Sequence, residues 1–150
     1  MRRVAEVDLP GLAQRFHHCG RHSFFALQSV HGYSLSELQS VFEDAPPLLF
    51  ADELAHAASL LQLSDIDAQQ GHARVQLCGE PPHGWLRGVC QLLGHIAVTR
   101  LYAYVFADEA CEVQALGRVG FQREAVFRQH VYLAGEFRDV HVYGWLGQAA

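Results

Sequence analysis

The last third of the chain, residues 100–146, constrains the fold more than any other stretch. Its predicted elements, in chain order, are a strand over Leu101–Phe106, a helix over Glu109–Arg118, and two long strands over Phe121–Leu133 and Glu136–Leu146. Gly120 is placed to end the helix, because glycine tolerates the left-handed conformation that often follows a last helical turn. Ala134-Gly135 separates the two long runs of strand-forming residues. This order predicts a strand, a helix and a β-hairpin.

The preceding stretch predicts a helix between two strands. His72–Cys78 alternates polar and apolar residues, as a half-buried strand does, and Gly84–Val98 has apolar residues at helical spacing. A strand–helix–strand unit within one sheet makes its two strands parallel, whereas hairpin strands are antiparallel. We therefore expect a single α+β domain over residues 1–150, with a mostly antiparallel twisted sheet of about six or seven strands and one parallel crossover.

Helix caps and turn residues divide the first half of the chain. Asp8 is a predicted N-cap with Pro10 in the first turn, and Ser34 and Glu37 have the spacing of a capping box. The remaining predicted elements are strands over 3–7, 48–51 and 54–66, helices over 8–20 and 34–42, turns at 52–53 and 67–71, and a loop over 79–83.

Composition narrows the range of functions. The 150 residues are 50% hydrophobic and 18% charged, which suits one globular domain with a sizeable core. We expect neither a membrane span, because no apolar run reaches about 18 residues, nor a secretory signal, because the N-terminus lacks a continuous apolar segment. The formal net charge of −5 disfavours nucleic acid as the main partner.

The cysteines and histidines do not predict a metal site. Cys19, Cys78, Cys90 and Cys111 are scattered without a C-x-x-C pair, so we expect buried free thiols in a reduced, cytoplasmic protein. The densest histidine cluster lies between residues 17 and 22, but Gly20 interrupts its helix and no second ligand pair has structural-zinc spacing.

Several short motifs in the second half resemble one enzyme superfamily. They are Leu63–Asp67 (LSDID), Arg100–Val105 (RLYAYV), Gly120–Glu124 (GFQRE), Arg128–Leu133 (RQHVYL), Gly135–Val140 (GEFRDV) and Tyr143-Gly144. Over about Leu60–Leu146 the chain resembles the GNAT N-acetyltransferases, in particular the branch of ribosomal-protein alanine and amino-sugar acetyltransferases. A lone Gly-Phe pair would be weak evidence, but the hairpin motifs that follow it at this spacing make the resemblance specific.

The resemblance implies a site for acetyl-CoA. In such proteins the two parallel strands splay apart, the exposed strand backbone binds the extended pantetheine arm, and the next helix begins at the pyrophosphate. The implied cofactor-binding residues are Leu77, Cys78, Gly79, His83, Gly84, Trp85, Leu86 and Glu109. The family's phosphate loop has a basic residue or Gln, then two small residues, at slots that here hold Pro81, Gly84 and Leu86. Only Gly84 keeps the pattern, so the loop is degenerate and we expect weak acetyl-CoA binding.

Other positions depart from the resemblance as well. Arg74 stands where a general-base carboxylate is common, and Leu116 stands in the slot of the leaving-group tyrosine. Glu109 and Glu112 replace an Asn and a Ser at the start of a helix that faces the cofactor, and there they add negative charge. The catalytic residues therefore remain unassigned.

The acceptor pocket implied by the resemblance contains Phe24, Phe25, His130 and Tyr132. The simpler interpretation of these aromatic residues is packing in the core or across the hairpin. Trp85, beside the degenerate loop, is placed to fill space that a cofactor would otherwise take.

Two functions follow from the sequence. The first is a GNAT-type acyltransferase, impaired in cofactor binding, that moves an acetyl group from acetyl-CoA to a small-molecule or peptide amine. The alternative is an inactive protein of this fold that no longer binds acetyl-CoA and instead binds another ligand or a partner. The sequence leaves the oligomeric state open, with a homodimer as one option.

Overall fold

A seven-stranded sheet forms the centre of the molecule. The computed structural model describes residues 2–3, 23, 48–52, 59–79, 84–95 and 98–147. The strands are β1 (Arg2–Arg3), β2 (Leu48–Asp52), β3 (Ser59–Asp67), β4 (His72–Cys78), β5 (Arg100–Phe106), β6 (Gln122–Leu133) and β7 (Glu136–Leu146), and the helices are α4 (Trp85–Gly94) and α5 (Ala110–Val119). The order across the sheet is β1-β2-β3-β4-β5-β7-β6.

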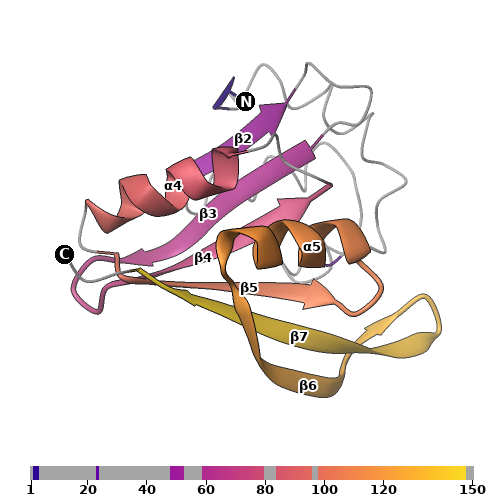
Figure 1. The fold of residues 1–150 in the computed structure, drawn as a ribbon. Coiled ribbons are helices and arrows are strands. Elements are labelled where there is room, and N and C mark those ends of the chain that lie inside the picture. The colour runs from indigo at the N-terminus through magenta and orange to yellow at the C-terminus, as the bar shows by residue number, and fades with distance from the viewer. Residues whose placement is uncertain are drawn as a thin grey trace.

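The pairing of the strands confirms the predicted α+β fold. β4 and β5 are parallel neighbours joined through α4, and the other five neighbouring pairs are antiparallel. Figure 1 shows α4 and α5 on the same face of the sheet, with the β6–β7 hairpin extending beyond them.

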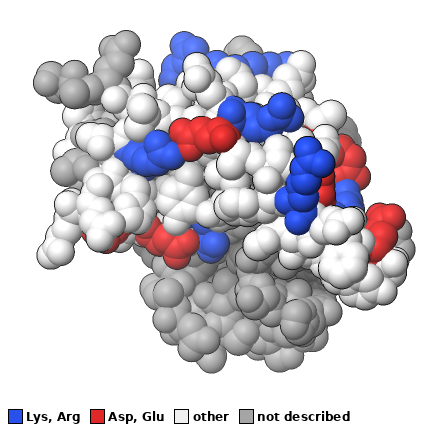
Figure 2. Space-filling model, turned by 90° about the horizontal axis from the view of Figure 1, so that it is seen from below, with Lys and Arg blue, Asp and Glu red and all other residues white. Residues whose placement is uncertain are grey.

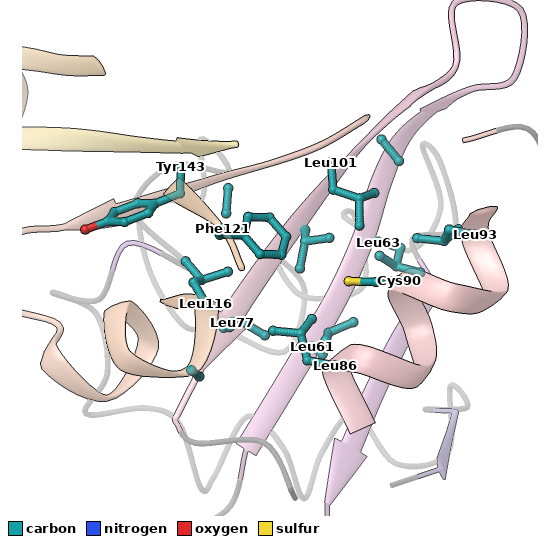
Figure 3. Packing of buried hydrophobic residues seen from close by; sticks show 14 of the residues in the cluster. Leu61, Leu63, Leu77, Leu86, Cys90, Leu93, Leu101, Leu116, Phe121 and Tyr143 are labelled. Atoms are coloured by element: carbon teal, nitrogen blue, oxygen red, sulfur yellow. The ribbon is translucent and has the colours of Figure 1, made fainter. Parts of the chain in front are cut away.

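The core lies between this face and the two helices. Alternate residues of β4 and β5 point into it, since successive strand side chains face opposite sides. The helices contribute residues three or four positions apart, which share one helical face. Figure 3 shows part of this cluster, which includes Leu61, Leu63, Ala73, Val75, Leu77, Leu86, Cys90, Leu93, Leu101, Ala103, Val105, Ala115, Leu116, Phe121 and Tyr143.

The two helices end differently. The prediction that the first runs to Val98 is wrong, because α4 ends at Gly94 and Val98 donates its N–H to the Leu93 carbonyl at 3.2 Å outside the helix. α5 ends as predicted at Gly120, which has a φ of 99° and donates its N–H to the last carbonyls of the helix. That φ lies in the left-handed region, which glycine adopts without the steric cost of a Cβ.

Three predicted turns fall in the described residues. The turn at 67–71 is confirmed, and the Asp67 carboxylate accepts the Gln69 and Gln70 N–H groups at 2.9 Å each. The hairpin turn is also confirmed, because Ala134 and Gly135 have φ values of 54° and 90°, which suit a type I′ turn. Asp52 was wrongly placed in a turn, since it pairs with Ser59 as the last residue of β2.

Part of the N-terminal prediction lies outside the described residues. This applies to the helices over 8–20 and 34–42, to residues 4–7 and 54–58 of the predicted strands, and to the histidine cluster at 17–22.

Candidate functional site

The strands β4 and β5 separate after a short stretch of pairing. Their ladder consists of three pairs and ends at Arg74 and Tyr102. Beyond that point β4 remains paired with β3 up to Cys78, and β5 remains paired with β7 up to Phe106. Figure 1 shows the two strands diverging towards the start of α5. We call Val75–Gly79 and Ala103–Phe106 the divergent segment, and it confirms the predicted splaying of the parallel strands.

A carboxylate from α5 reaches the end of the divergent segment. Glu112 Oε1 accepts the backbone N–H of Gly79 at 2.6 Å, and the Glu112 side chain is only 5% exposed. Gly79 has a φ of 78°, so the chain turns away from the strand at this residue. The structure therefore buries Glu112 as a partner for the end of β4, whereas the sequence predicted only added charge at the helix start.

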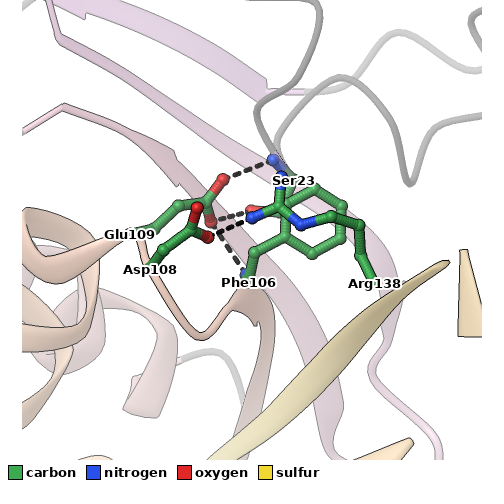
Figure 4. Close-up of polar contacts among 5 residues, drawn as sticks. All are labelled: Ser23, Phe106, Asp108, Glu109 and Arg138. Carbon is green, nitrogen blue, oxygen red and sulfur yellow. Dashed lines mark hydrogen bonds and ion pairs between the residues drawn. The ribbon is translucent and has the colours of Figure 1, made fainter. Parts of the chain in front are cut away.

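Glu109 caps the end of β5 from the other side. One of its oxygens accepts the Phe106 N–H at 3.0 Å, and its other oxygen accepts the backbone N–H of the buried Ser23 at 2.5 Å. The Ser23 hydroxyl also donates to Glu109, as Figure 4 shows. This carboxylate joins residue 23 to the loop between β5 and α5.

An ion pair and a ring contact complete this corner of the site. Arg138 of β7 pairs with Asp108, and its guanidinium lies 4.5 Å from the centre of the Phe106 ring (Figure 4). A cation over an aromatic face is favourable, so Arg138 orders the end of β5 as well as neutralising Asp108.

The start of α4 has an open side and a buried side. Gly84 is exposed with a φ of 81°, and a Cβ built there would meet nothing within 4 Å. Leu86, in contrast, packs into the core, so the large side chain that breaks the family's small-residue pattern is buried rather than exposed at the helix start. Trp85 packs partly against the same core. His83 and the two prolines at 81 and 82 lie outside the described residues.

Arg87 was not singled out from the sequence. It is exposed in the first turn of α4 and is the only charged residue of that helix. A cation there adds to the partial positive charge that a helix N-terminus already carries. A basic residue just inside the helix, rather than before it, was the signal that could have identified it.

An aromatic row crosses the sheet face opposite the helices. Its ring centroids are separated by 5.6 Å between Tyr102 and Tyr104, 6.2 Å between Tyr104 and Phe127, and 5.2 Å between Phe127 and His130. His130 of the predicted acceptor pocket therefore belongs to this row. Tyr132 does not, because it pairs with Phe137 farther along the hairpin and is 65% exposed. Phe24 and Phe25 lie outside the described residues.

Polar groups lie beside the aromatic row. Arg74 contacts Asp65 at 3.1 Å and Ser64 at 3.0 Å, and the Tyr102 hydroxyl donates to Asp65 at 3.3 Å. Burial, followed by the nearby Asp65 charge, raises the pKa of Tyr102. The phenol therefore stays protonated at neutral pH, where it can donate a hydrogen bond but does not act as a base.

Gln76 of β4 is the second residue that the sequence analysis missed. Its side chain is 1% exposed, and neither amide atom has a hydrogen-bond partner within the described parts of the chain. A polar residue in an otherwise apolar half of a strand was the available signal. A buried amide without a partner is costly, which marks this position in the divergent segment for a polar contact.

The thiols and the acidic groups do not form a metal centre in the part of the chain that the structure describes. No group of three or more metal-ligating side chains occurs there. Cys78 and Cys90 are buried and form no disulfide, as predicted, but the prediction is wrong for Cys111, which is exposed because it lies on the outer face of α5. Burial raises the pKa of Cys90 to about 12.

The surface charges are mixed. Figure 2 shows Arg side chains interspersed with Asp and Glu over the described part of one face. Among the described ion pairs, Arg100 and Glu124 lie 2.5 Å apart. Among the helices of the described residues, none is long and apolar enough to cross a membrane.

The comparison with known proteins finds similarity to solved structures. No protein-family model and no curated protein sequence matches the chain. Among solved structures, spermidine N-acetyltransferase from Vibrio cholerae in complex with CoA and spermine superposes with a TM-score of 0.71 at 18% identity, over 97% of this chain and 93% of that one. A ribosomal L7/L12 N-terminal acetyltransferase in complex with CoA gives 0.70 at 16%, over 99% and 94%.

A ribosomal-protein-alanine N-acetyltransferase from Brucella melitensis gives a TM-score of 0.66 at 12% identity, over 97% of this chain and 98% of that one. Each of these proteins is similar over nearly its whole length. The chain therefore has the fold of the GNAT N-acetyltransferases.

Proposed function

We propose that the protein is a GNAT-type N-acyltransferase that moves an acetyl group from acetyl-CoA to an amine, with weakened binding of the donor. The observation that carries the proposal is the divergent segment, in which β4 and β5 no longer pair with each other; β4 leads from it towards α4, and β5 leads from it towards α5. A strand edge of this kind can pair with an extended, amide-bearing ligand. The structural neighbours crystallised with CoA support the same assignment.

The donor site fits acetyl-CoA only in part. Open space at Gly84 and the cation of Arg87 at the start of a ten-residue helix suit an anionic phosphate. Pro81 and Pro82 just before that helix have no N–H to donate. Each missing charge-assisted hydrogen bond weakens binding by about 1.5–3 kcal/mol, so we infer a donor affinity weaker than about 100 μM.

The acceptor side is the sheet face that carries the aromatic row. Tyr102 is the last β5 residue that pairs with β4, and Tyr104 lies in the divergent segment; the row continues from them through Phe127 to His130. Aromatic faces attract cationic amines, so the row itself suits a cationic acceptor; the Asp65 carboxylate next to Tyr102 is balanced by Arg74 at 3.1 Å. Acetyl-CoA supplies an activated acetyl group, which the amine takes up with release of the CoA thiol.

A thiol-release assay at millimolar acetyl-CoA tests this function. Suitable amines are spermidine and a short peptide with an N-terminal alanine. They are chosen because two proteins of similar structure are named as acetyltransferases of spermidine and of ribosomal-protein alanine. We expect slow, amine-dependent release of CoA that does not saturate below about 100 μM donor. Release that does not depend on any added amine would contradict the acceptor assignment.

The alternative is a protein of this fold without acetyltransferase activity. One observation favours it, because the buried Glu112 carboxylate already occupies the Gly79 N–H at the end of β4. The two functions differ in a single measurement. If the alternative holds, acetyl-CoA does not bind even at millimolar concentration. If the protein is an acyltransferase, acetyl-CoA binds weakly and the binding reaches saturation.

A further inference from the structure

The Glu112 carboxylate accepts a hydrogen bond from the backbone N–H of Gly79, as an oxygen of a bound ligand would. The residues are 33 positions apart, and the carboxylate oxygen lies 2.6 Å from the backbone nitrogen at the point where β4 ends. A buried backbone N–H requires a partner. Here an α5 side chain, rather than a neighbouring strand, provides it.

The occupied N–H lies at the end of the divergent segment. The β4–β5 ladder stops at Arg74, so β5 no longer pairs with β4 beyond this residue. An acyl oxygen or a carboxylate lying along this part of β4 would need the same donor at Gly79. One N–H makes one good hydrogen bond, so Glu112 and such a ligand exclude each other. The buried negative charge also disfavours any anionic group that approaches.

We propose that Glu112 is a built-in ligand of the donor site, which occupies the Gly79 N–H and lowers the affinity for an acyl-CoA. This inference rests on the proposed function. It attributes the weak binding of acetyl-CoA to Glu112 of α5 as well as to the degenerate loop. The class of ligand that Glu112 displaces is an acyl thioester or a small carboxylate, because both present an oxygen to a backbone donor.

Glu109 provides a matched comparison. It lies one helical turn before Glu112 and carries the same charge, but its carboxylate is held by Ser23 and by the Phe106 N–H. Replacing Glu109 removes one negative charge near the site and leaves the Gly79 contact in place.

The experiment compares the unmodified protein with Glu112→Ser, Glu112→Gln and Glu109→Gln. Acetyl-CoA affinity is measured by calorimetry, and the Gly79 amide is followed by NMR. We expect Glu112→Ser to bind acetyl-CoA about ten-fold tighter or more. Glu112→Gln keeps a carbonyl acceptor for Gly79 and should gain less, and Glu109→Gln removes the same charge without freeing the Gly79 N–H and should also gain less than Glu112→Ser. The Gly79 proton should move upfield in Glu112→Ser, because it loses a hydrogen bond to a charged acceptor.

A second measurement tests the contact without acetyl-CoA. Acetate added to Glu112→Ser should restore a downfield Gly79 signal and raise the melting temperature, with no comparable effect on the unmodified protein. If Glu112→Ser folds poorly, Glu112→Gln serves in the NMR comparison with a smaller upfield shift of the Gly79 proton, because a neutral carbonyl replaces the charged acceptor.

The outcomes separate this inference from the proposed function. Equal acetyl-CoA affinity in the unmodified protein and Glu112→Ser, or an unchanged Gly79 signal, would overturn the role of Glu112 and leave the acyltransferase standing. If neither protein binds acetyl-CoA at millimolar concentration, the proposed function fails, and the inference fails with it as far as an acyl-CoA is concerned.

Discussion

Glu112 and Gly79 connect α5 to the end of β4 through one partly buried hydrogen bond of 2.6 Å. The contact lies where the parallel strands have parted, so it replaces part of the lost strand pairing. It also satisfies a backbone donor that would otherwise be buried without a partner. The same bond therefore contributes to stability and lies at the site where we propose that a ligand binds.

Glu112→Ala should lower the free energy of unfolding by about 1–3 kcal/mol, because the Gly79 N–H loses its hydrogen-bond acceptor. Urea denaturation of both proteins measures the difference. Glu112→Gln is the control, since it keeps a carbonyl acceptor and should lose less. A loss below about 0.5 kcal/mol in Glu112→Ala would show that water replaces the carboxylate without cost.

Replacing a glycine by alanine should have opposite effects on stability inside α5 and just after its last residue. Gly120 has a φ of 99°, so Gly120→Ala forces a Cβ into the left-handed region and should cost about 1–2 kcal/mol. Gly117 lies inside the helix with nothing within 4 Å of an added Cβ. Gly117→Ala should therefore stabilise the protein by up to about 1 kcal/mol. Thermal unfolding of the pair checks the helix end, and a stabilising Gly120→Ala would contradict it.

Cys90 should make the protein less stable at alkaline pH. Burial raises its pKa from 9.0 to about 12, so the folded protein keeps a proton that the unfolded chain releases in this range. The contribution is complete below pH 9 and is lost as the pH rises towards 12, with a slope of up to about 1.4 kcal/mol per pH unit. Denaturation at several pH values measures this slope, and Cys90→Ala should lack it. Identical slopes in the two proteins would contradict the burial of this thiol.

His130 and Tyr132 should differ in their effect on the amine substrate. His130 belongs to the aromatic row, whereas Tyr132 pairs with Phe137 farther along the hairpin. We expect His130→Ala to raise the KM for the amine about five-fold without changing acetyl-CoA affinity, on the scale of a lost cation–aromatic contact. Tyr132→Ala should leave both values unchanged. An equal effect of both substitutions would place the acceptor along the whole hairpin instead.

The elements with strong local signals were predictable. Alternation in His72–Cys78 predicts that strand with its observed limits, because period is a local property. The turn at Ala134-Gly135 predicts the hairpin, whose first strand begins at Gln122, one residue later than expected. The end of α4 was not predictable in the same way. Apolar residues at helical spacing continue past Gly94, but Val98 already belongs to the path into β5, and tertiary packing decides where the helix stops.

The site was predictable in its backbone and less so in its side chains. The resemblance predicts the splayed strands and includes Gly79 among the implied cofactor-binding residues, but it does not predict the contact of Gly79 with Glu112. The burial of Leu86 and the partner of Glu112 depend on how α4 and α5 rotate against the sheet. Sequence spacing shows which residues share a helix face, but it does not show which face meets the sheet. The Gln76 amide, left without a partner in the described structure, likewise becomes visible only when its surroundings are in place.

Calorimetric titration of the unmodified protein with acetyl-CoA tests the central claim most directly. The proposed acyltransferase with a weakened donor site predicts saturable binding with a Kd between about 100 μM and a few millimolar. Low-micromolar binding would contradict the weakening that we ascribe to the altered loop and to Glu112. The absence of heat at millimolar acetyl-CoA would contradict the acyltransferase itself and leave the alternative, a protein of this fold with another ligand.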